Sequence, residues 1–158
     1  MTTILNYLWR FWLIILAFVL TIILGLPVYI LSLKKSTFKY AHVLIRIWCY
    51  GMFFGMGLRY ELINLTDKKI DKNTQYVIIS NHTSIMDIML PCILFPNHPL
   101  CYVGKKELVK IPLFGFFYKR TCILVDRSSS KSRMAVFERA QKRLNQGLSV
   151  CIFPEGGV

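Results

Sequence analysis

The sequence predicts an α/β fold, a sheet flanked by helices, preceded by apolar N-terminal helices. Two observations predict it: strand-like runs alternate with a helical pattern after residue 58, and two long apolar stretches come before. The length of 158 residues allows one ordinary domain. A content of 54% hydrophobic and 18% charged residues excludes intrinsic disorder. We therefore divide the chain into a membrane-anchoring helical region, 1–58, and a partial α/β domain, 59–158.

The first apolar stretch, Phe11–Leu33, has 23 residues without a formal charge. As a helix it would be ~35 Å long, enough to cross a hydrocarbon core of about 30 Å. Lys34, Lys35 and Lys39 follow it and only Arg10 precedes it closely, which places the downstream chain on the cytoplasmic side. The formal net charge of +12, beside so much apolar sequence, favours a phospholipid membrane as partner and argues against nucleic acid.

The second apolar stretch, Tyr40–Leu58, contains His42, Arg46 and several glycines. A formal charge and glycines disfavour a full span, so we expect a helix that lies in the membrane interface. Gly25 and Pro27 also leave open a bend in the first helix, so that both helices would form a re-entrant hairpin.

The domain that follows is expected to contain five strands and one long helix. The strands are predicted at Tyr60–Leu65, Tyr76–Ser80, Leu100–Val103, Thr121–Val125 and Leu148–Phe153. The helix follows Ser128–Ser130, and its apolar stripe is predicted to contain Met134, Phe137, Ala140 and Leu144. Because the last strand has the pattern of a central strand and only five residues follow it, we expect the sheet to be incomplete at its C-terminus.

The segment Asn81–Asp87, directly after the second predicted strand, carries the strongest candidate chemistry. Ser84 and Asp87 have the spacing of a capping box, so Asp87 could be a helix cap alone and His82 an ordinary loop histidine. Alternatively, Asp87 orients His82, which removes a proton from an alcohol at the sheet edge where open α/β folds bind ligands.

Charged side chains follow the later strands at the same predicted edge. Lys105 follows the third strand, Arg127 the fourth and Glu155 the fifth. The two cations are either a solvated surface or a site for a phosphate group. No histidine or cysteine spacing matches a familiar metal site, so no metal is expected.

Three sequence blocks resemble those of the glycerolipid acyltransferase family, in particular bacterial 1-acyl-glycerol-3-phosphate acyltransferases. The family block N-H-x-x-x-x-D is matched by Asn81–Asp87. The second block is matched by Tyr102–Leu108, Ile111–Gly115 and Val125–Arg127, and the third by Phe153–Gly156. The resemblance implies a glycerolipid-acyltransferase-like sheet and a membrane enzyme, in the bacterial inner membrane, whose catalytic part faces the cytoplasm.

The resemblance also implies the roles of individual residues. His82 would be the general base, oriented by Asp87, and would activate the free hydroxyl of a lysophospholipid, 1-acyl-glycerol-3-phosphate. The co-substrate would be an acyl thioester, acyl-CoA or acyl-carrier protein, with no cofactor. The residues implied to bind substrate are Asn81, Ser84, Lys105, Arg127, Glu155 and Gly156.

The chain departs from the family pattern after Gly156, where Thr-Arg-Ser is expected and Gly157-Val158 stands instead. Besides the acylation of 1-acyl-glycerol-3-phosphate, two alternatives therefore stay open: the chain is a truncated, inactive membrane-bound fragment of such an enzyme, or it acylates another lysolipid acceptor.

Overall fold

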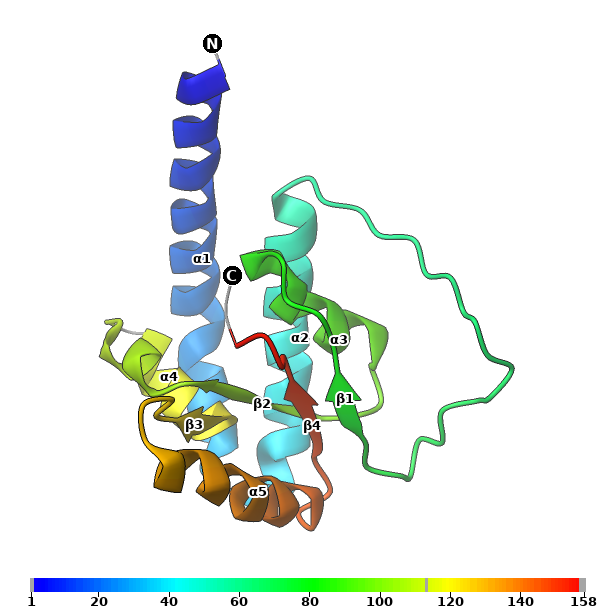
Figure 1. Ribbon diagram of the computed structural model, residues 1–158. Helices are drawn as coiled ribbons and strands as arrows, with labels where there is room; N and C mark the ends of the chain where they lie inside the picture. The colour runs from blue at the N-terminus through cyan, green and yellow to red at the C-terminus, as the bar shows by residue number, and fades with distance from the viewer. Residues whose placement is uncertain (1, 113, 157–158) are drawn as a thin grey trace.

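A helical hairpin and an α/β layer build the structure (Figure 1), a computed structural model that describes residues 2–112 and 114–156. The hairpin consists of α1 (Thr2–Ser32), the 3-10 helix η1 (Lys35–Thr37) and α2 (Phe38–Gly55). Leu113 of the second family block lies outside the described residues, as do Gly157 and Val158, on which the expected departure from the family pattern rests.

Within the described residues, four parallel strands form the sheet, which confirms the α/β prediction. They are β1 (Val77–Ile79), β2 (Leu100–Lys105), β3 (Cys122–Val125) and β4 (Ser149–Ile152), in the spatial order β1-β4-β2-β3. The connections contain η2 (Ile85–Met89), α3 (Leu90–Leu94), η3 (Lys106–Lys110), α4 (Phe114–Thr121) and α5 (Ser130–Leu144). Since every pairing is parallel, all four carboxyl ends lie at one edge of the sheet, as the sequence predicted.

Two of the strand predictions are corrected. Tyr60–Leu65 is not a strand: it runs as exposed coil, with Leu65 93% exposed, because it lies beside no strand of the described sheet. The strand β1 is present but is not buried, since it lies at the sheet edge with Val77 and Ile79 exposed on one face. The prediction of a central last strand is confirmed, because β4 lies between β1 and β2.

Helix α5 covers one face of the sheet with a stripe that matches the predicted one in part. Ala140 and Leu144 pack against the sheet, as predicted. Met134 and Phe137 are 66% and 73% exposed, so their place in the stripe was wrong, and Val136, four residues before Ala140, packs against the sheet in their place. Apolar side chains occur on two sides of this helix, and only the contact with the sheet decides which side is buried.

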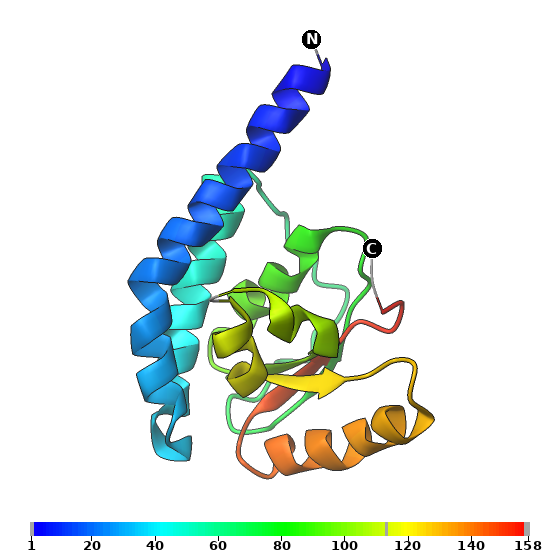
Figure 2. The same cartoon turned by 90° about the vertical axis from the view of Figure 1, so that its left-hand side faces the viewer.

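Helix α1 continues through Pro27, and α2 packs along it in both views (Figure 2). Within the described residues, α1 is the one helix long and apolar enough to cross a membrane by length and composition, and it is mostly exposed. Gly51 and Gly55 let the two helices approach closely. A β-carbon on either glycine would lie less than 3 Å from Leu20 or Leu16 of α1.

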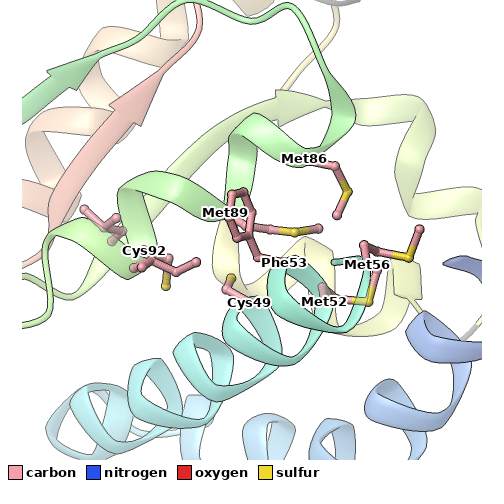
Figure 3. Packing of buried hydrophobic residues seen from close by; sticks show 9 residues of the cluster. Cys49, Met52, Phe53, Met56, Met86, Met89 and Cys92 are labelled. Atoms are coloured by element: carbon pink, nitrogen blue, oxygen red, sulfur yellow. The ribbon is translucent and has the colours of Figure 1, made fainter. Parts of the chain in front are cut away.

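Helix α2 also belongs to the core on the second face of the sheet. Cys49, Met52, Phe53 and Met56 of this segment pack against Met86, Met89 and Cys92 from η2 and α3 (Figure 3). The residues of β2 alternate between the two layers: Leu100 faces this cluster and Cys101 faces α5. The hairpin therefore shares one hydrophobic core with the α/β layer and forms a wall of whatever site lies between them.

Candidate active site

An apolar cavity of about 730 Å³ lies between the helical hairpin and the carboxyl edge of the sheet. Its walls come from α1, α2, η2, β2, η3, α4 and the start of β3, together with the loops that follow β1, β3 and β4. The large apolar side chains that line it include Leu24, Val28, Ile45, Trp48, Ile88, Met89, Leu108, Phe114 and Phe117. His82 and Ser84 also line the cavity, so the imidazole of His82 borders a space that suits a hydrocarbon ligand.

The structure brings His82 and Asp87 together, as the second of the two sequence interpretations requires. Nδ1 of His82 lies 3.8 Å from Oδ2 of Asp87, and the side chains are 15% and 24% exposed. This is an ion-pair distance and too long for a hydrogen bond. Nδ1 is buried and has no hydrogen-bond partner in the described part of the chain.

The capping box predicted from Ser84 and Asp87 is also present, at the start of η2. The backbone N–H of Met86 donates to Oγ of Ser84 at 3.2 Å, and that of Ser84 donates to Oδ2 of Asp87 at 2.7 Å. Thr83 donates to the same oxygen from its backbone N–H, also at 2.7 Å. Partial burial acts to raise the pKa of Asp87, but these hydrogen bonds outweigh it and hold the pKa below its usual value.

Two residues after β4 contact His82. Oε2 of Glu155 accepts a hydrogen bond from the backbone N–H of His82 at 3.0 Å. The ring of Phe153 lies 4.7 Å from the imidazole, centroid to centroid. The chain after β4 thus contacts the loop after β1 through both a hydrogen bond and a ring contact.

The two predicted phosphate-binding cations line the same cavity as His82. Lys105 reaches it from the end of β2 and Arg127 from beyond β3. Gly156 has a φ of +78°, and a β-carbon there would lie 2.8 Å from Nη1 of Arg127. Lys106, by contrast, is exposed and pairs with Asp126 at 3.8 Å.

Of the eight predicted site residues, five line the cavity: His82, Ser84, Lys105, Arg127 and Gly156. Asp87 and Glu155 do not line the cavity but contact His82, and Asn81 is exposed and also lies outside the cavity lining. Within the described residues, no group of three His, Cys, Asp or Glu side chains is arranged to hold a metal ion.

Sequence reasoning missed the contribution of the hairpin and of Tyr102. Val28 and Trp48 line the cavity, although the hairpin was predicted only as an anchor. The hydroxyl of Tyr102 is buried against the site and has no partner among the described residues. One feature of the sequence could have indicated that the two helices pack together: Thr21 is a polar residue within an apolar helix. In the structure, Nε1 of Trp48 in α2 donates a hydrogen bond to the hydroxyl of Thr21 at 3.2 Å.

Comparison with known proteins identifies the family. A sequence model of the family described as "Acyltransferase" matches residues 62–158, more than half of the chain. The chain belongs to the acyltransferase family. The matched range contains all eight predicted site residues, so the acyltransferase family assignment and the geometry concern the same part of the molecule.

Several acyltransferases with the printed name 1-acyl-sn-glycerol-3-phosphate acyltransferase are similar to the chain. The Helicobacter pylori protein is 35% identical over 51% of this chain and 34% of its own length. The Escherichia coli protein is 32% identical over 68% of this chain and 45% of its own length. The Borreliella burgdorferi protein is 28% identical over 73% and 43%. The chain thus spans less than half the length of these relatives, and no solved structure gave a significant match.

Proposed function

We propose that the chain is an O-acyltransferase that moves a fatty acyl group from a thioester to the free hydroxyl of 1-acyl-glycerol-3-phosphate. The observation that carries the proposal is the position of His82, paired with Asp87, in the wall of an apolar cavity that Lys105 and Arg127 also line. The names of the relatives support the choice of acceptor.

In the proposed reaction, His82 removes the proton of the acceptor hydroxyl as that oxygen attacks the thioester carbonyl. Nδ1 faces Asp87, so Nε2 is the nitrogen left for the proton. The Asp87 carboxylate stabilises the imidazolium that forms. The tetrahedral intermediate then expels the thiolate, which needs little acid assistance since a thiol has a pKa of about 8.5. The imidazolium gives up its proton to the departing thiolate or to water.

The environment of the pair supports this use of the site. An acyl chain fits the apolar volume between the hairpin and the sheet, and the acceptor phosphate fits Lys105 and Arg127 at the carboxyl edge. A distance of 3.8 Å between Nδ1 and Oδ2 is long, as catalytic contacts often are without substrate, and we expect it to shorten when the acceptor binds.

The exposed apolar surface of α1 supports a membrane location for this reaction, because the acceptor and the product are both lipids. Flotation of the purified chain with phospholipid vesicles tests the location. Removal of residues 2–24 should abolish flotation if α1 is the anchor, whereas flotation of the shortened chain would contradict this role.

Acyl transfer is tested with the chain in vesicles that contain 1-acyl-glycerol-3-phosphate. Two thioester donors, acyl-CoA and acyl-carrier protein loaded with the acyl group, are offered separately. Thiol release and phosphatidic acid formation are both measured. His82→Ala should abolish both, whereas Asn97→Ala, an exposed change at the opposite edge of the sheet, should not alter them. Equal rates in the wild type and His82→Ala would overturn the mechanism.

The phosphate site is tested with neighbouring lysines. Lys105→Ala should raise the KM for the acceptor, while Lys106→Ala, whose side chain is exposed and paired with Asp126, should leave it unchanged. A neutral acceptor, 1-acyl-glycerol, should not distinguish the two variants. A preference for that acceptor in the wild type would point to another lysolipid as substrate.

A further inference from the structure

A tyrosine hydroxyl belongs to the cavity that the two cations line, and the proposed mechanism does not use it. Tyr118 lies in α4, which packs against α1, η3 and β3. Its side chain lines the cavity together with Lys105 and Arg127. Only 8% of Tyr118 is exposed, so packing against the protein sets the position of its ring.

Gly104 shows where the hydroxyl of Tyr118 lies. Side chains alternate along β2, so Gly104 is on the same face as Leu100 and Tyr102, the face toward the cavity. A β-carbon built on Gly104 would overlap the hydroxyl oxygen of Tyr118. The hydroxyl therefore occupies the space that a side chain would fill on this face, and the next residue of the strand is Lys105.

The ring that carries this hydroxyl is fixed before any ligand binds. Phe114, one turn earlier in α4, stacks on Tyr118 with ring centroids 5.2 Å apart. A β-carbon on Gly115 would overlap the backbone carbonyl of Val109, so α4 lies directly against η3. A side chain held in this way loses little conformational freedom when it binds a ligand.

Lys105 and Arg127 offer the same kind of hydrogen-bonding group as this hydroxyl. An ammonium and a guanidinium carry N–H donors and have no acceptor atom. Burial raises the pKa of Tyr118, and the charge of Arg127 acts in the opposite direction without reversing the shift, so the hydroxyl keeps its proton and can donate. Three donors that line one cavity suit an anion with several acceptor oxygens.

We propose that the hydroxyl of Tyr118 is a third donor to the acceptor phosphate, beside Lys105 and Arg127. The missing side chain of Gly104 makes room for it. This inference rests on the proposed function and specifies the acceptor site. A phosphate monoester has three terminal oxygens, so donors from β2, from the loop after β3 and from α4 can all be satisfied at once. An acceptor without the phosphate gains nothing from the hydroxyl, so Tyr118 contributes to selection of the charged acceptor.

Binding without turnover tests the proposal. The chain in vesicles, with no acyl donor, is titrated with short-chain 1-acyl-glycerol-3-phosphate and with 1-acyl-glycerol of the same chain length. Tryptophan fluorescence reports binding, because Trp48 lines the cavity. Tyr118→Phe removes only the hydroxyl and should raise the Kd for the phosphorylated ligand about tenfold, with no change for the neutral one.

The matched control is Tyr29→Phe. The hydroxyl of Tyr29 accepts a hydrogen bond from Arg120 at 3.4 Å and lies outside the cavity lining, so this variant should bind both ligands as the wild type does. Equal Kd values for the phosphorylated ligand in wild type and Tyr118→Phe would overturn the proposal. Absence of any binding of that ligand to the wild type would overturn it too.

Kinetics separate the acceptor phosphate from the phosphates of acyl-CoA. Tyr118→Phe should raise the KM for the acceptor and leave the KM for acyl-CoA unchanged, and a rise confined to acyl-CoA would refute the assignment. A wild type that shows the expected Kd values but transfers no acyl group would contradict the proposed function and still support this binding site. Gly104→Ala should also raise the Kd for the phosphorylated ligand, because its β-carbon displaces the hydroxyl. Tyr118→Phe keeps the ring and remains decisive if Gly104→Ala does not fold.

Discussion

Replacement of Asp87 by Asn distinguishes two roles for this residue, a carboxylate that assists acyl transfer and a residue that only caps the helix. The amide oxygen of Asn can still accept the N–H groups of Thr83 and Ser84, but the negative charge beside His82 is lost. At 3.8 Å and an effective dielectric constant of about 20, a carboxylate stabilises an imidazolium by about 4 kcal/mol. This corresponds to about a thousandfold in rate, since each 1.36 kcal/mol is about tenfold. Loss of a cap costs only about 1 kcal/mol of stability.

The assay measures thiol release from the acyl donor beside the free energy of unfolding in the same detergent or vesicle. The matched control is Ser129→Ala, because the hydroxyl of Ser129 caps α5 by accepting from the N–H of Ser132 at 3.2 Å, away from the cavity. We expect Asp87→Asn to lose activity far beyond its loss of stability and Ser129→Ala to lose stability alone. If both variants lose activity only in proportion to their stability, Asp87 is a cap and nothing more.

The pH dependence of stability provides a second measurement on the same variant. The pKa of Asp87 is lowered in the folded state, so its carboxylate stabilises the fold fully above the ordinary carboxyl pKa of about 3.9. That contribution disappears as the pH falls through the lowered folded value. The stability difference between wild type and Asp87→Asn should therefore be constant from about pH 5 to 7 and shrink below about pH 4. A difference that does not change down to acid unfolding contradicts the lowered pKa.

Two further pairs of variants test the anion site and the revised face of α5. Gly156→Ala and Gly147→Ala both place a side chain at positive φ and should each cost about 1–2 kcal/mol of stability. Only Gly156→Ala displaces Arg127, so only it should raise the KM for the acceptor; equal KM values would remove Arg127 from the phosphate site. Phe137→Gln should change the urea-derived unfolding free energy by less than about 0.5 kcal/mol, and Val136→Ala should cost about 1–2 kcal/mol. The reverse order would restore the stripe first predicted.

The parts of the fold that the sequence predicts well depend on local pattern. The residues of β2, β3 and β4 are β-branched or apolar runs bounded by charged or turn residues, and their parallel order follows from the helices between them. The site is predictable for the same reason: Lys105 is the last residue of β2, Arg127 lies two residues after β3, and parallel strands end at one edge.

The parts that were missed depend on contacts between distant segments. Leu62 and Ile63 have a strand-like composition, but a strand exists only where a neighbour pairs with it, and composition does not indicate the neighbour. The first half of the α5 stripe was missed for a similar reason, because Met134 and Val136 are both apolar and only packing against the sheet selects Val136. The wall that Trp48 contributes to the cavity depends on the close packing of α1 against α2 at Gly51.

The two interpretations of Asp87 that the sequence leaves open are compatible in the structure. One oxygen, Oδ2, accepts the N–H groups of Thr83 and Ser84 and also faces Nδ1 of His82. The capping hydrogen bonds fix the carboxylate, and they keep it ionised by lowering its pKa. Glu155 accepts a hydrogen bond from the backbone N–H of His82, so the loop that carries the imidazole is held as well as the carboxylate. The capping hydrogen bonds therefore fix the carboxylate of Asp87 where it can orient the imidazole of His82. A residue that only capped the helix would not need to lie beside His82.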